Sequence, residues 1–144
     1  MIVLDTNVVS ELMRPSPAAV VRDWVQARDA HEIHVTSVTL AETRHGIQRL
    51  PGGRRKELLR TAAADVFAMF HDRILSFDDA AAAQYALIVT ARDVIGQPIG
   101  GFDAQIAAIC RVRGATLATR DVKGFTATGI ELIDPWHTAR SPTP

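Results

Sequence analysis

The chain has 144 residues, of which 47% are hydrophobic and 22% are charged, with 16 basic and 16 acidic residues. This length and composition fit a single globular domain and exclude a disordered or fibrous protein. No apolar run approaches the roughly 18 residues that cross a bilayer, and no secretory leader is expected, so we predict a cytoplasmic protein without membrane contact. The lone cysteine, Cys110, excludes an intramolecular disulfide and a cysteine-based zinc site, and we expect it to be buried.

Short apolar runs alternate along the chain with longer amphipathic segments. The short runs predict strands over Ile2–Leu4, Ile33–Thr36, residues 74–77, Thr116–Ala118 and Glu131–Ile133. Apolar residues at helical spacing predict helices over residues 17–27, 37–50, 54–71, 78–95 and 103–113. We expect Ser37 and Asp78 to cap helix N-termini and Gly114 to end the last helix.

The order β-α-α-β-α-α-β-α-α-β-β, which includes a further helix between the first two strands, predicts the fold class. It is typical of an α/β protein, here an α/β/α sandwich with a short, mainly parallel sheet of about five strands flanked by helices. Neither an internal repeat nor a linker interrupts the pattern. We therefore expect one domain over residues 1–137 and a disordered tail over residues 138–144.

Four acidic residues stand at the edges of apolar segments: Asp5, Glu42, Asp103 and Asp121. Taken singly, each has an ordinary explanation as a helix cap, a turn residue or an exposed helix position. Because ligand sites of open α/β sheets form beyond the carboxyl ends of the strands, the fold allows all four to face one cleft. Carboxylates gathered in this way either take up protons or bind a cation.

The residue types favour a hard cation over zinc. An oxygen-only set suits Mg²⁺ or Mn²⁺, and the histidines show no metal-ligand spacing (His31, His34, His45, His71 and His137). Basic residues gather between Arg44 and Arg60, and this stretch is either a solvated helical face or a surface for nucleic acid.

Four motifs in this order and spacing resemble the PIN domain, over nearly the whole chain. They are DTNVVSEL at the start, AETRHG around Glu42, DAQIAA at Asp103 and ATRDVKGF near the end. More narrowly, the chain resembles the VapC toxins of type II toxin–antitoxin systems, in the branch similar to FitB. The resemblance implies a Mg²⁺-dependent endoribonuclease, with Mn²⁺ as a substitute ion, in which the four acids are the catalytic and metal-binding residues.

The resemblance also implies roles for further residues and for partners. Thr6, Asn7 and Thr119 would support the acidic cluster, and Arg44, Arg120 and Lys123 would contact RNA. A VapB- or FitA-like antitoxin would block the cleft with its C-terminal segment, and operator DNA would be bound only through that antitoxin. The family implies a homodimer.

Two departures from the family pattern concern the site. Many members carry a further acid immediately before the last phenylalanine, where this chain has Gly124 before Phe125, and this leaves open whether one or two metal ions bind. A small residue often precedes the third acid, where this chain has Phe102.

Three alternatives compete with the nuclease interpretation. A haloacid-dehalogenase-type phosphatase needs a second acid two residues after Asp5, where this chain has Asn7. A response-regulator receiver would need paired acids near the first strand and a late lysine, and neither fits. A PIN-like module that binds RNA or protein without catalysis stays open, although the presence of all four acids argues against it.

Overall fold

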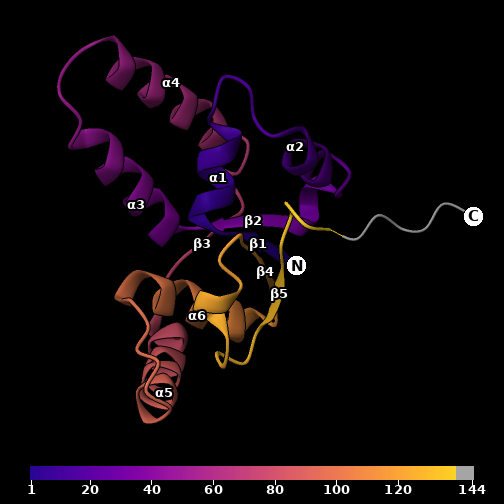
Figure 1. Cartoon of the computed structure of the whole chain (residues 1–144), viewed down its shortest axis with the longest axis vertical. Helices are drawn as coiled ribbons and strands as arrows, with labels where there is room; N and C mark the ends of the chain where they lie inside the picture. Colours follow the sequence, from indigo (N-terminus) through magenta and orange to yellow (C-terminus); the bar gives the residue numbers. More distant parts are fainter. Residues whose placement is uncertain (139–144) are drawn as a thin grey trace, which may run out of the picture.

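The computed structural model of the chain describes residues 1–138 (Figure 1). Residues 139–144 of the predicted tail lie outside the described residues. Within the described part, five strands form one sheet in the order β3-β2-β1-β4-β5, and every pairing is parallel. The strands are β1 (Ile2–Leu4), β2 (Ile33–Thr36), β3 (Ile74–Leu75), β4 (Thr116–Ala118) and β5 (Glu131–Ile133). The predicted fold class and number of strands are confirmed.

Pairs of α-helices connect β1 to β2, β2 to β3 and β3 to β4, as the predicted element order requires. They are α1 (Thr6–Leu12), α2 (Ala19–Gln26), α3 (Ser37–Gln48), α4 (Arg54–Ala68), α5 (Asp79–Val94) and α6 (Gly101–Arg113), with 3₁₀ turns η1 (Ala30–Glu32) and η2 (Lys123–Phe125). Asp78 caps α5, and Gly114 ends α6 with a left-handed φ of 60°, both as predicted. None of the helices in the described part of the chain is long and apolar enough to cross a membrane.

The sheet is covered on both faces, with α1–α4 on one side and α5 and α6 on the other (Figure 1). Successive residues of a strand point to opposite faces, so Leu4 packs in the core beneath α1–α4 while its neighbour Val3 packs against α6. Helix α6 contributes a buried run from Ile106 to Cys110 to that second core. The Cys110 thiol is buried as expected, and burial raises its pKa to about 12, which leaves it protonated and unreactive.

The structure corrects several predicted boundaries. The helices predicted over residues 17–27, 37–50 and 103–113 run over Ala19–Gln26, Ser37–Gln48 and Gly101–Arg113. Strand β3 spans two residues rather than the predicted 74–77, because it pairs only with Val35 and Thr36 at the edge of the sheet. Thr36, not Ser37, caps α3, and its hydroxyl accepts from the Thr39 amide at 3.1 Å. Helix α4 ends at Ala68 rather than at residue 71.

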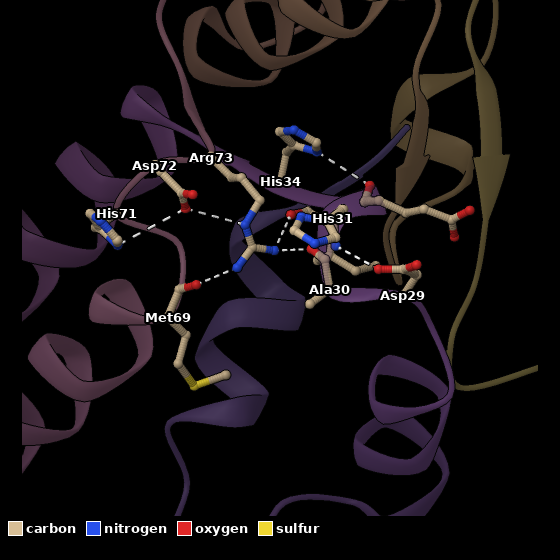
Figure 2. A network of polar contacts seen from close by, with 10 residues as sticks. Asp29, Ala30, His31, His34, Met69, His71, Asp72 and Arg73 are labelled. Atoms are coloured by element: carbon tan, nitrogen blue, oxygen red, sulfur yellow. Dashed lines mark hydrogen bonds and ion pairs between the residues drawn. The ribbon is translucent and has the colours of Figure 1, made fainter.

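Arg73 fixes the connection between α4 and the edge of the sheet (Figure 2). Its guanidinium donates to the carbonyl groups of Ala30, Ile33 and Met69, and its own carbonyl accepts from the Val35 amide at 3.1 Å. The end of α4 is therefore tied to the start of β2. The histidines drawn beside Arg73 form no metal-binding group in the described part of the chain.

Candidate active site

The carboxyl ends of β1 and β4 define the place where a site forms. These two strands lie side by side, with Leu4 opposite Ala118. The chain that leaves β1 leads to β2, which pairs with the opposite edge of β1. Connections that diverge in this way open a crevice beyond the strand ends. Asp5 follows β1 directly, and Thr119 follows β4, so the register places these two residues next to each other at the crevice.

A cleft of about 600 Å³ occupies this position, and all four acids identified in the sequence line it. Each comes from a different segment: Asp5 from the end of β1, Glu42 from α3, Asp103 from the first turn of α6 and Asp121 from the loop after β4. The remaining lining residues are Thr6, Asn7, Ser10, Glu11, Arg14, Arg120, Phe125 and Trp136. The predicted convergence of residues up to 116 positions apart is therefore present in the fold.

Asp5 is buried, with 4% of its surface exposed, and is held by hydrogen bonds on both oxygens. Its Oδ1 accepts from the Thr6 amide at 2.8 Å, and its Oδ2 accepts from the Thr119 hydroxyl at 2.8 Å. The pKa of Asp5 is raised to about 6, chiefly by burial and to a smaller extent by the charges of Asp103 and Glu42, despite the lowering effect of the hydrogen bonds. Desolvation thus outweighs hydrogen bonding at this carboxyl group.

Thr119 is the centre of the polar contacts beneath the cleft. Its buried hydroxyl donates to Asp5 and accepts from the Asn7 side-chain amide at 3.2 Å and from the Asp121 amide at 3.1 Å. Asn7 in turn accepts at its Oδ1 from the Arg120 amide at 3.2 Å. These bonds join the start of α1 to the loop after β4, so the expected supporting positions of Thr119 and Asn7 lie in contact with the acids.

A row of three threonine hydroxyls leads to Glu42. Thr6 Oγ1 donates to Glu42 Oε1 at 2.9 Å and lies 3.1 Å from Thr39 Oγ1, which lies 3.4 Å from Thr36 Oγ1. Because each hydroxyl carries one proton, Thr39 donates to Thr6 and Thr36 donates to Thr39. This row orients the Glu42 carboxylate from the α3 side, although burial raises its pKa and the charge of Asp103 adds to that rise.

Asp103 couples the acids on the two sides of the cleft. It lies in the first turn of α6, where the helix dipole favours a negative charge. Burial nevertheless raises the pKa of Asp103, and the charge of Asp121 raises it to a smaller extent. Asp103 also raises the pKa of both Asp5 and Glu42, so it lies within electrostatic reach of the other three acids.

Arg14 and Arg120 line this acidic cleft, but in the described part of the chain neither is paired with one of the four acids. Among the described residues, none of the four acids forms an ion pair. No three Asp, Glu, His or Cys side chains of residues 1–138 lie close enough together to hold a metal ion. Two unit charges about 4 Å apart repel by roughly 4 kcal/mol at an effective dielectric constant of 20, which opposes closer approach of bare carboxylates. The donor set is made only of oxygen, as a hard divalent cation requires.

The three basic residues expected to contact RNA lie in different places. Arg120 lines the cleft, and its guanidinium lies 4.9 Å from the centre of the Trp136 ring. Lys123 is exposed in η2 and does not line the cleft, while Arg44 lines a separate groove between α3 and α4. The sequence prediction grouped the three, and the fold separates Arg44 from the other two.

Four residues of the cleft wall were not predicted from the sequence: Ser10, Glu11, Arg14 and Trp136. Asn7, Glu11 and Arg14 recur at helical spacing. This pattern was the available signal that α1 and the residue pair that follows it present one face to the cleft. The carboxylate of Glu11 accepts from the Ala18 amide at 2.8 Å, and this hydrogen bond lowers its pKa. Asp134 accepts from the Trp136 amide at 2.8 Å, which fixes the turn that carries the indole.

Replacing Thr119 by valine is expected to weaken metal binding by roughly 10- to 100-fold, the usual effect of losing an outer partner of a metal ligand. Valine keeps the shape but leaves Asp5 without its shortest side-chain donor, and the unpaired polar groups cost about 1–3 kcal/mol of unfolding free energy. The buried Thr43 hydroxyl has no hydrogen-bond partner among residues 1–138, so Thr43→Val is the matched control. Calorimetric Mn²⁺ titration and urea unfolding measure both effects, and equal behaviour of the two variants would contradict this role of Thr119.

Comparisons with known proteins agree with this fold and cleft. The family model of the PIN domain matches residues 2–130. The VapC ribonuclease Y4jK of Sinorhizobium fredii is 36% identical over 96% of the chain and 100% of its own length. The toxin FitB of Neisseria gonorrhoeae is 36% identical over 95% of the chain and 99% of its own length. The solved structure of FitAB bound to an IR36 DNA fragment superimposes with a TM-score of 0.89 at 35% identity, covering 97% of this chain and 99% of that one.

The chain thus belongs to the PIN-domain family and, within it, to the VapC and FitB group of ribonuclease toxins. This confirms the resemblance drawn from the four sequence motifs. It also excludes the phosphatase and the receiver domain as alternatives.

Proposed function

We propose that the chain is the toxin of a type II toxin–antitoxin pair and hydrolyses RNA phosphodiester bonds with Mg²⁺, for which Mn²⁺ substitutes. The observation that carries the proposal is the cleft at the ends of β1 and β4. Four carboxylates from four segments line it without a basic partner among the described residues, and burial raises the pKa of three of them. A divalent cation removes the cost of these charges, and ribonuclease relatives share the fold.

Asp5 and Asp103 would hold the ion most directly, with Glu42 and Asp121 as outer ligands or ligands of a second ion. When bound, Mg²⁺ supplies a Lewis acid that activates water and neutralises the charge that develops on the phosphate. The side chains of this chain do the rest. Thr119 and the Thr6 amide fix the rotamer of Asp5, and Thr6 orients Glu42, so the carboxylates are prepared before substrate arrives.

Arg14 and Arg120 would bind the phosphates of the RNA strand that flank the cleavage point. Both line the cleft, and Arg14 is anchored by Glu11 at 3.4 Å while Arg120 lies on the Trp136 ring. Their charge offsets the repulsion between the acidic cleft and a polyanion. Phosphate contacts of this kind position a nucleic acid without reading its sequence.

RNA cleavage by the purified chain without its antitoxin tests the proposal. We expect cleavage of total RNA with Mg²⁺ or Mn²⁺, none with EDTA, and a loss of at least about 100-fold in Asp103→Asn, more than an outer-sphere change removes. Asp93→Asn, an exposed acid on α5, is the control and should retain full activity. Cleavage that persists in EDTA or in Asp103→Asn would refute the proposal, and binding of RNA without cleavage would support the non-catalytic module.

The groove between α3 and α4 fits the antitoxin partner in this proposal. It has a volume of about 870 Å³, an apolar floor that includes Leu40, Ile47 and Phe67, and a rim that carries Arg44 and Arg60. A helix that is apolar on one face and acidic on its flanks would fit such a groove. Because α3 also carries Glu42, a segment bound there lies on a helix that contributes to the cleft.

Ala64→Trp is expected to weaken antitoxin binding by at least about tenfold, because the indole fills the groove and each 1.4 kcal/mol lost is a factor of ten. RNA cleavage by the free toxin should not change. Thr61→Trp on the same helix does not line the groove and serves as the control. Biolayer interferometry against the antitoxin measures the effect, and unchanged affinity of Ala64→Trp would exclude this groove as the docking site.

The proposal further includes a homodimer in the cytoplasm that reaches operator DNA only through its antitoxin. Support for the dimer comes from the exposed apolar side chains at the end of α5, where Val94 is 80% and Ile95 is 51% exposed. FitAB, the structural relative bound to DNA, supports the role of an antitoxin in operator binding.

A further inference from the structure

The loop after β4 gives the Asp121 carboxylate a position that depends on Gly124. The Gly124 amide donates to Asp121 Oδ1 at 3.1 Å and to the Asp121 carbonyl at 3.2 Å. A Cβ atom on residue 124 would lie 2.2 Å from Asp121 Oδ2 and 2.7 Å from its Cγ. These distances are far inside van der Waals contact. The carboxylate of Asp121 therefore fills the volume that any side chain on residue 124 requires.

A buried arginine limits how far the loop adjusts. Arg92 is 5% exposed, and its guanidinium donates to the carbonyls of Gly124 at 2.8 Å and Thr126 at 2.9 Å, while its Nε donates to the carbonyl of Gln97 at 2.6 Å. Arg92 forms no ion pair with an acid among the described residues. The three carbonyl groups therefore provide the hydrogen-bond acceptors for its buried guanidinium. Moving the backbone of Gly124 would break bonds to a buried charge, so a clash at this point displaces Asp121 instead.

We propose that Gly124 is a positioning residue that keeps free the space from which Asp121 presents its carboxylate to the cleft. Positions 121 and 124 share one corner of the acidic site, and only one of them has room for a side chain there. In this chain residue 121 carries the acid and residue 124 has none. The inference rests on the proposed function, because the carboxylate that Gly124 would position is a proposed ligand of the metal ion.

A double-mutant cycle on Mn²⁺ affinity tests the proposal. Gly124→Ala is expected to weaken Mn²⁺ binding by roughly 10- to 100-fold, as much as Asp121→Ala does. Adding Gly124→Ala to Asp121→Ala should change the affinity less than twofold, because the side chain that clashes is already gone. Gly46→Ala is the control, since a Cβ there meets no atom within 4 Å, and it should bind Mn²⁺ like the wild type.

Two further variants keep the test decisive. If Gly124→Ala is too unstable to titrate, the double variant D121A/G124A should recover the melting temperature of Asp121→Ala; failure to recover it would overturn the proposal. The exchanged variant D121A/G124D should regain at least about fivefold in Mn²⁺ affinity over Asp121→Ala, because a carboxylate returns to the same corner.

If Gly124→Ala lowered the Mn²⁺ affinity equally in the wild-type and Asp121→Ala backgrounds, the proposal would be overturned, since Gly124 would then act through the fold and not through Asp121. An unaffected Gly124→Ala would overturn it as well. If the wild-type chain itself binds no Mn²⁺, the proposed function fails together with the inference. If it binds normally and Gly124→Ala binds equally well, the inference fails alone.

Discussion

Replacing Asp5 by asparagine is expected to abolish RNA cleavage while making the metal-free protein more stable at neutral pH. The pKa of Asp5 rises from the model-peptide value of 3.8 to about 6 on folding, mainly through burial. Its ionised form is therefore disfavoured in the native state. The free energy of unfolding therefore falls as the pH rises from about 4 to about 6. Above pH 6, where Asp5 is ionised in the native state, it is lower by about 3 kcal/mol.

Asparagine removes the charge but retains an oxygen that accepts from the Thr6 amide. The bond from the Thr119 hydroxyl is weakened, which costs about 1 kcal/mol, so the expected net gain is about 2 kcal/mol at pH 7.5 in the presence of EDTA. Cleavage should fall by at least about 100-fold, because a carboxylate that would hold the metal directly is lost.

Urea unfolding at pH 4.5 and pH 7.5 measures the change in stability. The gain of Asp5→Asn should be present at pH 7.5 and largely absent at pH 4.5, where Asp5 of the wild type is protonated. Asp93→Asn, in which the acid is exposed, should show no such difference. A variant that is less stable than the wild type at pH 7.5, or one that cleaves RNA at the wild-type rate, would contradict the role given to Asp5.

The stabilisation of the wild-type protein by Mn²⁺ is expected to depend strongly on pH. A ligand of the native state at 100 times its dissociation constant stabilises by about 2.7 kcal/mol. At pH 5 the metal must displace at least one proton from Asp5, whose pKa is about 6, so the affinity falls about tenfold. The same Mn²⁺ concentration then stabilises by only about 1.4 kcal/mol.

Thermal melting with and without Mn²⁺ at pH 5 and pH 7.5 measures this difference. The shift in melting temperature should be clearly larger at pH 7.5. Asp5→Asn should show little shift at either pH, which separates binding in the cleft from weak binding elsewhere on the surface. Equal shifts of the wild type at the two pH values would mean that the metal does not compete for the proton on Asp5.

Much of this architecture was predictable because it depends on local patterns. The apolar runs at Ile2–Leu4 and Ile33–Thr36 match their strands residue for residue, and the cap at Asp78 and the glycine at Gly114 mark helix ends through chemistry confined to one turn. The convergence of four acids followed from a general property of parallel sheets rather than from any single motif.

The details that failed depend on contacts between distant segments. The length of β3 is set by how much of β2 is available at the edge, and the choice of Thr36 over Ser37 as a cap depends on where the strand ends. Arg44 follows Glu42 by two positions, and residues two apart on a helix face different directions, which places it in another groove. The position of the Asp121 carboxylate depends on the missing side chain of Gly124 through distances between single atoms, which the spacing of residues in the sequence does not reveal.

Calorimetric titration of Mn²⁺ into the wild-type protein and into Asp103→Asn at pH 7.5 tests the central claim most directly. Asp103 is within electrostatic reach of all three other acids, so its loss removes the most strongly shared ligand. We predict a saturable isotherm for the wild type and a loss of affinity of at least about 100-fold in the variant, with both proteins folded by circular dichroism. Equal affinity of the two proteins, or no binding to the wild type, would contradict the assignment of the acidic cleft as a metal centre.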